Sequence, residues 1–354
     1  MTGSGEGSGT LRPDVTDQRT VPLSVLDLSG VGTGRTSADA LADSTALART
    51  ADRLGFHRFW VAEHHSMPAV ASTSPAVLLA HLGAHTDRIR LGSGGVMLPN
   101  HPSLVIAEQF AMLEALHPGR IDLGIGRAPG ADPMTAAALR RTGEEDFPTE
   151  LVDVLALLGQ PAAGLSPTPA ATRLIATPSA SGTPQVWLLG SSLYSAQLAA
   201  RLGLAFSYAH HFNTGLTEQA AAAYRSGFQP SAVQARPRFM VSSSVIVADS
   251  EERAAWLSGP SRVMMLRLRT RGPLAPVVTP EEAEQLLDTL AADPDGRAVM
   301  AQIPGTQITT TAEPAVAALR ELVDRVDADE LMLTATTYDV ADRIHTLERI
   351  AELW

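Results

Sequence analysis

The sequence of 354 residues contains no cysteine and no lysine. Without cysteine the chain has no disulfide, no zinc–thiolate centre and no thiol nucleophile. All 27 basic residues are arginine, so Schiff-base chemistry on lysine, including that of pyridoxal phosphate enzymes, is excluded. The phosphate loop of P-loop enzymes is excluded too, because it requires a lysine. These two absences remove several enzyme classes before any motif is considered.

Positive charge and long apolar runs are also scarce. The net charge is −11, and no basic patch with interleaved aromatic residues is present, so nucleic acids and anionic membranes are poor partners. No window approaches the roughly 18 apolar residues of a membrane helix. Residues 1–20 lack the charged start and apolar middle of a signal peptide. We therefore expect a soluble cytoplasmic protein in which residues 1–20 form a disordered leader.

From residue 21 onward, strand-like and helix-like patterns alternate. Short apolar runs ended by glycine or polar residues predict eight strands, at Val21–Ser29, Arg58–Ala62, Arg88–Val96, Arg120–Gly126, Gln185–Gly190, Leu204–Ala209, Arg238–Ala248 and Glu330–Thr336. Helical periodicity predicts helices at Ala38–Gly55, Ser74–His85, Ser103–Leu116, Asp146–Leu158, Leu193–Leu202, Leu216–Gly227, Ser250–Trp256, Glu313–Val326 and Val340–Leu353.

This alternation favours a single α/β domain over residues 21–354, a (β/α)8 TIM barrel with insertions. An open, doubly wound sheet is the alternative, because periodicity does not report whether a sheet closes. Residues 259–311 show no clear pattern and are predicted to be an irregular insertion or lid.

Several of the predicted strands end in polar residues or glycines. Glu63-His64-His65 follow the second strand, Gly94-Gly95 the third, Arg127 the fourth and Gly190-Ser191-Ser192 the fifth. In a parallel barrel these ends meet at one mouth. An arginine can bind a phosphate in a bidentate manner, and helix-start amides can take its remaining oxygens. The mouth is therefore predicted to hold a phosphate-bearing ligand.

Each of these features also has a purely structural interpretation. A serine pair before a helix is most often an N-cap, and a glycine pair can be a bulge needed for packing. We also considered a metal site made of His64, His65, His210 and His211. Adjacent residues of a strand point to opposite faces, and no His-Glu-x-x-His spacing occurs, so we expect no metal.

Three segments together resemble the bacterial luciferase-like flavin monooxygenase family, in its single-chain, FMN-linked branch. They are "RFWVAEHHSMP", "RIRLGSGGVMLPNHPSLVIAEQFAMLEALHPGRIDLGIGRAPGADP" and "VWLLGSSLYSAQLAARLGL". The resemblance implies a TIM barrel, usually dimeric, that binds reduced FMN at the carboxyl ends of its strands. It implies that a separate reductase supplies the flavin and that O2 reacts through a flavin peroxide to oxygenate a small organic substrate.

The resemblance also implies roles for individual residues. His64 matches the catalytic histidine, and Glu63 would support it, with Arg127 as a candidate partner. Arg127 matches the arginine that contacts the flavin and its phosphate. The phosphate cradle matches Gly190, Ser191, Ser192 and Tyr194. Gly94-Gly95 stand where the family often has a non-prolyl cis peptide beneath the flavin ring, and residues 259–311 stand where it carries a mobile lid.

Two departures from luciferase proper are visible. Gly126 stands where luciferase has a reactive cysteine, and Gly190 stands where it has a glutamate. We therefore do not expect light emission from an aldehyde. Two alternatives remain open at this point: a deazaflavin-dependent enzyme that transfers hydride on the same barrel, and a non-catalytic flavin-binding protein.

Overall fold

The computed structural model describes residues 20–128, 133–139, 146–270, 275–301, 305 and 307–354. Its centre is a ten-stranded sheet in which all paired neighbours are parallel. Eight strands close into a barrel: β1 Leu23–Asp27, β2 Arg58–Val61, β3 Arg90–Ser93, β5 Ile121–Gly126, β6 Gln185–Gly190, β7 Ala205–Tyr208, β8 Phe239–Val247 and β10 Glu330–Thr334. Closure comes from β10, which pairs with both β8 and β1. The predicted barrel is confirmed, and the open sheet is excluded.

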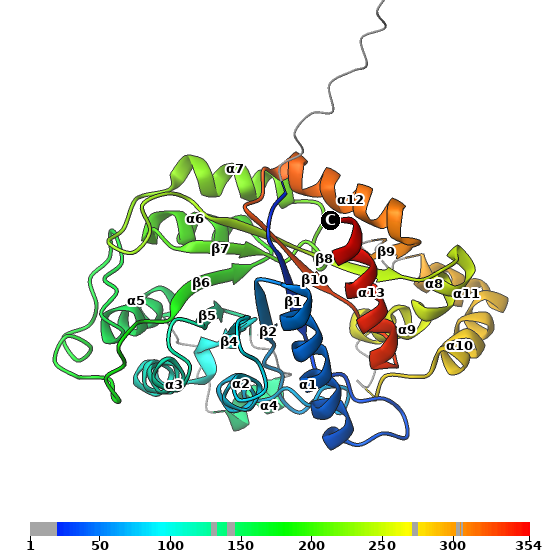
Figure 1. Ribbon diagram of the computed structural model, residues 1–354, viewed down its shortest axis with the longest axis horizontal. Coiled ribbons are helices and arrows are strands. Elements are labelled where there is room, and N and C mark those ends of the chain that lie inside the picture. Colours follow the sequence, from blue (N-terminus) through cyan, green and yellow to red (C-terminus); the bar gives the residue numbers. More distant parts are fainter. Residues whose placement is uncertain (1–19, 129–132, 140–145, 271–274, 302–304, 306) are drawn as a thin grey trace, which may run out of the picture.

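Helices surround the barrel on its outside (Figure 1). They are α1 Ser37–Leu54, α2 Pro75–Gly83, α3 Ser103–Leu116, α5 Phe147–Leu157, α6 Leu193–Leu202, α7 Thr217–Gly227, α8 Glu251–Leu257, α12 Ala312–Val326 and α13 Val340–Leu353. The short helix α4, Pro133–Ala138, and the 3-10 turn η1, Leu98–Asn100, lie in the connections. No described helix has the length and apolar character needed to cross a membrane.

The first helix shows how local chemistry sets these elements. Thr36 and Asp39 form a reciprocal capping box at the start of α1, and Gly55 ends the helix at φ 82°. A side chain is strained in that left-handed conformation, which glycine adopts freely. Between the caps, Leu47 and Ala51 are buried against the sheet. The apolar stripe and the two caps together determine where α1 begins, ends and packs.

The inside of the barrel is filled by large side chains. Trp60 from β2 and Trp187 from β6 are fully buried and meet edge to face, with ring centroids 5.7 Å apart. A Cβ added to Gly92 would lie 2.5 Å from the indole of Trp60, so β3 has room for this ring only because it carries glycine there. The barrel interior is therefore a packed core with no channel through it.

The amino-terminal ends of the strands are closed by a buried ionic network. Arg58, at the start of β2, donates to Asp122 of β5 at 2.6 Å and to Glu330 of β10 at 2.7 Å. Arg90 reaches the other oxygen of Asp122 at 2.6 Å, and Arg238 reaches Glu330 at 3.0 Å. Burial by itself would raise the pKa of Asp122, but Arg58 and Arg90 outweigh it and lower that pKa. Its stabilising contribution is therefore present at neutral pH and lost as the pH falls through the lowered pKa.

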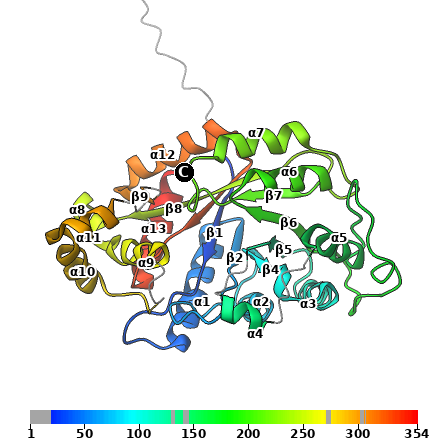
Figure 2. The same ribbon diagram turned by 180° about the vertical axis from the view of Figure 1, so that it is seen from behind.

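The described part of residues 259–311 is not irregular, so that part of the prediction was wrong, whereas the lid stays a prediction. The stretch contains α9 Gly259–Arg269, α10 Pro280–Ala292, α11 Pro294–Met300 and strand β9 Gln307–Thr310. These elements lie together on one side of the barrel (Figure 2). β9 extends the sheet beyond β8, and the two-residue strand β4, Val96–Met97, pairs with β5. The predicted leader falls almost entirely outside the described residues.

The helices of this insertion depend on caps that a periodicity search does not weigh. Thr279 and Glu282 form a capping box at the start of α10, with Pro280 in its first turn. Asp293 caps α11, where Pro294 again follows directly. Proline suits the first turn of a helix because the missing N–H has no partner there anyway. Local caps, rather than a long apolar stripe, define these short helices.

We predict that Asp122→Asn lowers the free energy of unfolding by about 3–5 kcal/mol, because it leaves Arg58 buried beside a neutral group. Urea unfolding followed by circular dichroism measures the change. Glu218→Gln removes the partner of Arg325 on the surface, where both side chains are exposed, and is the matched control. Equal urea midpoints for the two variants would show that the buried ionic network contributes no more to the free energy of unfolding than a surface ion pair does.

Candidate functional site

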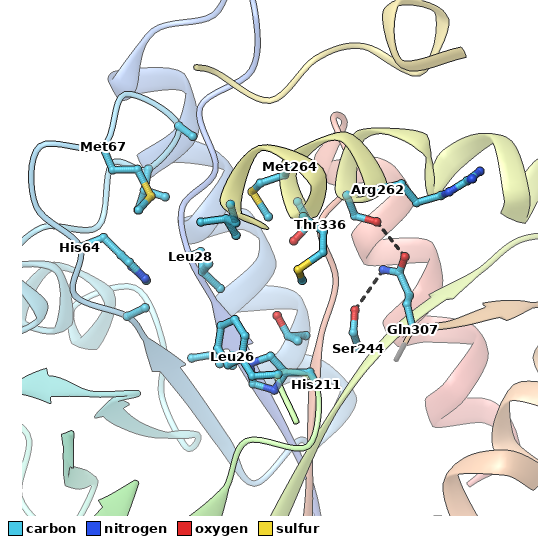
Figure 3. A pocket seen from close by; sticks show the side chains of 18 of the residues that line it. Leu26, Leu28, His64, Met67, His211, Ser244, Arg262, Met264, Gln307 and Thr336 are labelled. Atoms are coloured by element: carbon cyan, nitrogen blue, oxygen red, sulfur yellow. Dashed lines mark hydrogen bonds between the residues drawn. The ribbon is translucent and has the colours of Figure 1, made fainter. Parts of the chain in front are cut away.

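A cavity of about 660 Å³ opens at the carboxyl ends of the strands. Its wall includes Leu26 from β1, His64 from the turn after β2, Ser244 from β8, Met264 from α9 and Thr336 after β10. In Figure 3 these side chains surround one space from several sides. Because its walls come from segments more than 300 residues apart in the sequence, the cavity exists only in the closed barrel.

The cavity wall has two different sides. One side is apolar, with leucine, valine and methionine side chains from β1, the turn after β2 and α9. The other carries Ser244, Gln307 and Thr334, from β8, β9 and β10. None of the described lining residues is a carboxylate. The only arginine among them, Arg262, extends its side chain away from the centre of the cavity (Figure 3). The arrangement suits an organic molecule with a large apolar part and a hydrogen-bonding edge.

His64 is the lining residue whose side chain is best suited to chemistry in the cavity. Its backbone amide donates to Ser72 O at 3.2 Å, which ties the turn after β2 to the next segment. The buried Nδ1 of His64 has no hydrogen-bond partner within the described part of the chain. Burial lowers the pKa of the imidazole below its usual value, so the ring is neutral at pH 7. A neutral imidazole in the wall of a cavity can accept or donate a proton there.

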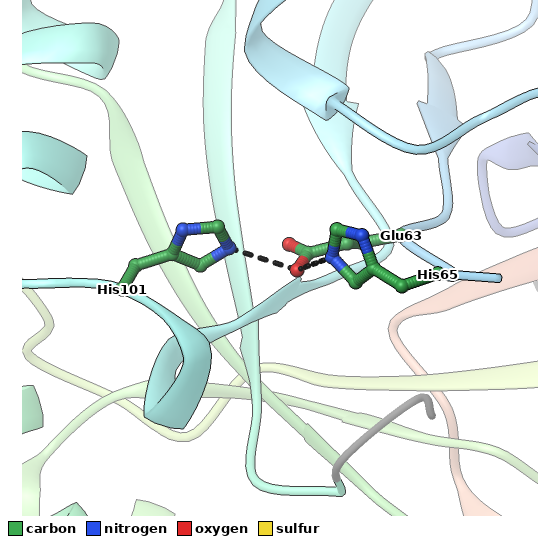
Figure 4. A group of neighbouring side chains, drawn as sticks. All are labelled: Glu63, His65 and His101. Atoms are coloured by element: carbon green, nitrogen blue, oxygen red, sulfur yellow. Dashed lines mark hydrogen bonds and ion pairs between the residues drawn. The ribbon is translucent and has the colours of Figure 1, made fainter. Parts of the chain in front are cut away.

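Glu63, next to His64 in the chain, accepts hydrogen bonds from two imidazoles (Figure 4). The Nε2 atoms of His65 and His101 both lie 2.8 Å from its Oε1, and the amide of Met97 donates to Oε2 at 3.1 Å. Burial raises the pKa of Glu63, but the hydrogen bonds from His101 and His65 outweigh it and lower that pKa. An ionised carboxylate only accepts hydrogen bonds, so both imidazoles donate through Nε2.

The predicted partnership of Glu63 with Arg127 is therefore wrong. Glu63 accepts from groups of its own turn and of the segment after β3, whereas Arg127 lies against a tyrosine elsewhere. The carboxylate thus joins the turn after β2 to the segment Met97–His101 and fixes the backbone on both sides of His64. Sequence reasoning assigned no role to His101, which is 38 residues away from Glu63 and carries no local signal of this contact.

The four histidines considered as metal ligands do not form one group. Among the described residues, the metal-binding atoms that approach one another, within 4.8 Å, belong to Glu63, His65 and His101. His210 forms a hydrogen bond with Thr217, and His211 forms one with Ser242. Burial lowers the pKa of His211 to about 4, so this lining ring is neutral. Hydrogen bonds from the Nε2 atoms of His65 and His101 to Oε1 of Glu63 account for the closeness of these three side chains.

The predicted cis peptide is present between Gly94 and Gly95. Gly94 lines the cavity, and a Cβ at this position would lie 2.6 Å from Cδ1 of Leu26. A Cβ on Gly95 would lie 2.9 Å from the carbonyl oxygen of Gly124. Both glycines are therefore required by close packing of this turn on the neighbouring strands. The contact of this pair with a flavin stays a prediction.

The residues predicted to hold a phosphate form a second group outside the cavity wall. The guanidinium of Arg127 lies 4.5 Å from the ring centre of Tyr194, in a cation–π contact. Ser192 is the N-cap of α6, since its hydroxyl accepts from the amide of Ser195 at 3.4 Å. A side chain on Gly190 would overlap Ser195, and the carbonyl of Ser191 accepts from Asn213 at 3.0 Å. The structural interpretation of the serine pair is thus correct for Ser192.

This second group still has the electrostatics of an anion site. Arg127 and Tyr194 are both exposed, so the guanidinium is available to a ligand. Ser192 opens a ten-residue helix, whose first amides and dipole attract negative charge. The group and the cavity lie at the same end of the barrel, because both follow the carboxyl ends of strands.

Comparison with known proteins gives a consistent result. A model of the luciferase-like monooxygenase family matches residues 21–351. A protein of Escherichia coli strain K12 named luciferase-like monooxygenase is 40% identical over 337 residues, which cover 93% of this chain and 96% of that protein. Among solved structures, apo-MsnO8 is 34% identical, with a TM-score of 0.82, and covers 94% of this chain and 98% of its own.

A more distant solved structure shares the fold. It is the oxygenating constituent of 3,6-diketocamphane monooxygenase from Pseudomonas putida, a type II Baeyer–Villiger monooxygenase, in complex with FMN. It is 17% identical to this chain, with a TM-score of 0.65, and covers 94% of this chain and 98% of its own. At this identity the likeness shows the fold alone.

Proposed function

Because the chain belongs to the luciferase-like monooxygenase family, we propose that it is an enzyme that uses reduced FMN and O2 to oxygenate a small organic substrate. The observation that carries the proposal is the cavity of about 660 Å³ with the neutral, unpartnered imidazole of His64 in its wall. Cavities of about 300–1,000 Å³ are typical of small-molecule sites.

The described residues fit the two ends of FMN. The flat ring suits the apolar part of the cavity beside Gly94, where no side chain projects. The phosphate suits Arg127, Tyr194 and the first turn of α6, which supply a guanidinium, a hydroxyl and helix-start amides. The flavin supplies the electrons that activate O2. The protein holds it, keeps water away through the apolar wall and places His64 as proton donor or acceptor.

The position of His64 is maintained by Glu63, His65 and His101. Glu63 is buried and binds both imidazoles and the Met97 amide, so the turn that carries His64 cannot move without breaking these bonds. We assign Glu63 to positioning and not to direct contact with the reacting atoms. The insertion that contains α9 covers the cavity through Met264 and Met265, which suits a lid.

The substrate that fits this wall is an uncharged, largely apolar molecule. No described lining residue is a carboxylate that would pair with an amine. The hydroxyls of Ser244 and Thr334 and the amide of Gln307 offer hydrogen bonds on one side. A carbonyl, hydroxyl or thioether group near an apolar body matches this distribution.

Two protein partners belong to the proposal. The distant FMN-bound neighbour is described as the oxygenating constituent of its enzyme, which supports a separate reductase as the source of reduced flavin here. A second copy of this chain is the other partner. Val77 on α2 and Val105, Met112 and Leu116 on α3 are large apolar side chains exposed on two helices in contact, and such a patch commonly marks an interface.

The protein should accelerate the reaction of reduced FMN with O2 in the dark, followed by absorbance after rapid mixing with air. His64→Ala should bind FMN nearly as well, yet change the oxidation rate of the bound flavin by about tenfold or more, because proton transfer contributes on that scale. A variant that binds and oxidises flavin like the original protein would indicate a non-catalytic flavin-binding protein. Binding of a deazaflavin in place of FMN would indicate hydride transfer.

Arg127→Ala should weaken FMN binding more than tenfold, since a charge-assisted bond to phosphate contributes about 1.5–3 kcal/mol. Equilibrium titration with fluorescence detection measures the dissociation constant. Arg236→Ala, an exposed arginine before the amino-terminal end of β8, is the matched control and should leave binding unchanged. Riboflavin lacks the phosphate. If Arg127→Ala weakened the binding of riboflavin, relative to Arg236→Ala, as much as it weakens the binding of FMN, Arg127 would not be the phosphate partner.

Sedimentation velocity should show a species of twice the chain mass of 37.3 kDa. Leu116→Arg places a charge in the apolar patch, at the end of α3, and should shift the protein to the monomer, because a buried unpaired charge is unfavourable. Leu286→Arg, at an exposed leucine of α10, is the control. A monomeric original protein would contradict the proposed dimer.

A further inference from the structure

Half of the methionines in the chain meet in one place. The sequence has ten methionines, and five of them line the cavity: Met67, Met97, Met264, Met265 and Met300. They come from the turn after β2, from β4, from α9 and from α11. Figure 3 shows the side chains of Met67 and Met264 among those that surround the space. The cavity is therefore lined by a belt of thioether groups, here called the methionine belt.

The remaining described methionines are placed quite differently. Met240 and Met332 are buried in the barrel core. Met112 and Met134 are 53% and 80% exposed on the outer surface. Solvent access alone would therefore lead an oxidant in bulk water to Met112 and Met134 first. An oxidant formed inside the cavity would reach the methionine belt first.

We propose that the methionine belt is a modification site, oxidised to methionine sulfoxide by hydrogen peroxide that forms in the cavity when reduced flavin meets O2 without an organic substrate. The inference rests on the proposed function, which brings both reactants to this cavity. The apolar methionine side chains that would hold a substrate are the same groups that peroxide modifies. Their oxidation would therefore regulate substrate binding.

The chemistry balances with these reactants. Reduced FMN gives two electrons and two protons to O2, which yields FMN and hydrogen peroxide. A lone pair of the thioether sulfur then attacks one peroxide oxygen, and the O–O bond breaks. That oxygen stays on sulfur as the sulfoxide. The other leaves as hydroxide and takes up the remaining proton to form water. Sulfur is oxidised by two electrons and peroxide is reduced by two.

The modification changes the property on which substrate binding depends. Oxidation turns a flexible apolar side chain into a polar one, and a sulfoxide in the wall must be hydrated or hydrogen-bonded. The apolar side of the cavity would lose its fit for an apolar substrate. Methionine sulfoxide is reversible by dedicated reductases, so the belt would act as a reversible off-switch during substrate-free turnover.

The experiment uses the full chain with FMN, NADH and a flavin reductase in air and in the dark, with catalase in excess. Catalase removes peroxide from bulk water but is too large to enter the cavity. Peptide mass spectrometry then compares sulfoxide at Met97, on the tryptic peptide of residues 91–120, with sulfoxide at Met134, on the tryptic peptide of residues 128–140. It also measures Met67, Met264 and Met265. We expect at least about fivefold more sulfoxide in the belt than at Met134.

A reference sample receives hydrogen peroxide without flavin or catalase. There Met134 should be oxidised faster than the belt, because it is 80% exposed. The variant Met67→Leu/Met264→Leu/Met265→Leu keeps similar volume without a thioether. It should keep its initial rate of oxygen uptake at least about threefold longer under substrate-free turnover than Met134→Leu does.

The outcomes separate the two levels of the proposal. If oxygen uptake is faster with the protein than with free reduced FMN, and the belt is oxidised no more than Met134, the inference is overturned and the proposed function stands. If the triple leucine variant and Met134→Leu lost their oxygen uptake equally fast, the inference would also be overturned. Oxygen uptake no faster than that of free reduced FMN would overturn the proposed function, and the inference with it.

Discussion

Arg58 forms two fully buried ion pairs that hold three strands of the barrel in place. One guanidinium joins β2 to β5 through Asp122 and β2 to β10 through Glu330. A buried charge is tolerable only when its partners are in place, so these strands have one register relative to one another. Because side chains alternate along a strand, that register also determines what lies at the other end of the barrel.

β2 shows this connection within one strand. Arg58 and Trp60 point into the barrel, whereas Phe59 and Val61 pack in the main core outside it. Ala62, the next inward position, lines the cavity. The successive inward residues of this segment are thus Arg58 at the amino-terminal end of the barrel, Trp60 in its middle and Ala62 at the cavity. If β2 shifted its register by one residue, Phe59 would point into the barrel in place of Arg58. Glu63 and His64 would then lie on the wrong faces.

At the mouth, the structure separates two kinds of recognition. The cavity has an apolar side and a neutral imidazole in its wall, while Arg127 and Tyr194 are exposed at the start of α6. An apolar ring and an anionic phosphate have opposite requirements for water, and a ligand that carries both can span the two regions. The carboxylate of Glu63 joins the turn that carries His64 to the segment Met97–His101, which holds that turn against the chain after β3.

Periodicity, caps and short-range spacing were enough to place the eight barrel strands, most of the helices, the glycine pair and His64 at a strand end. Three long motifs also identified the family. The folded chain was needed to show that Glu63 binds His65 and His101 and not Arg127. It was also needed to show that the described part of residues 259–311 folds into three helices and strand β9, and that five methionines from separate segments line the cavity. These contacts join segments distant in sequence, and periodicity reports which face is buried but not which residue lies opposite.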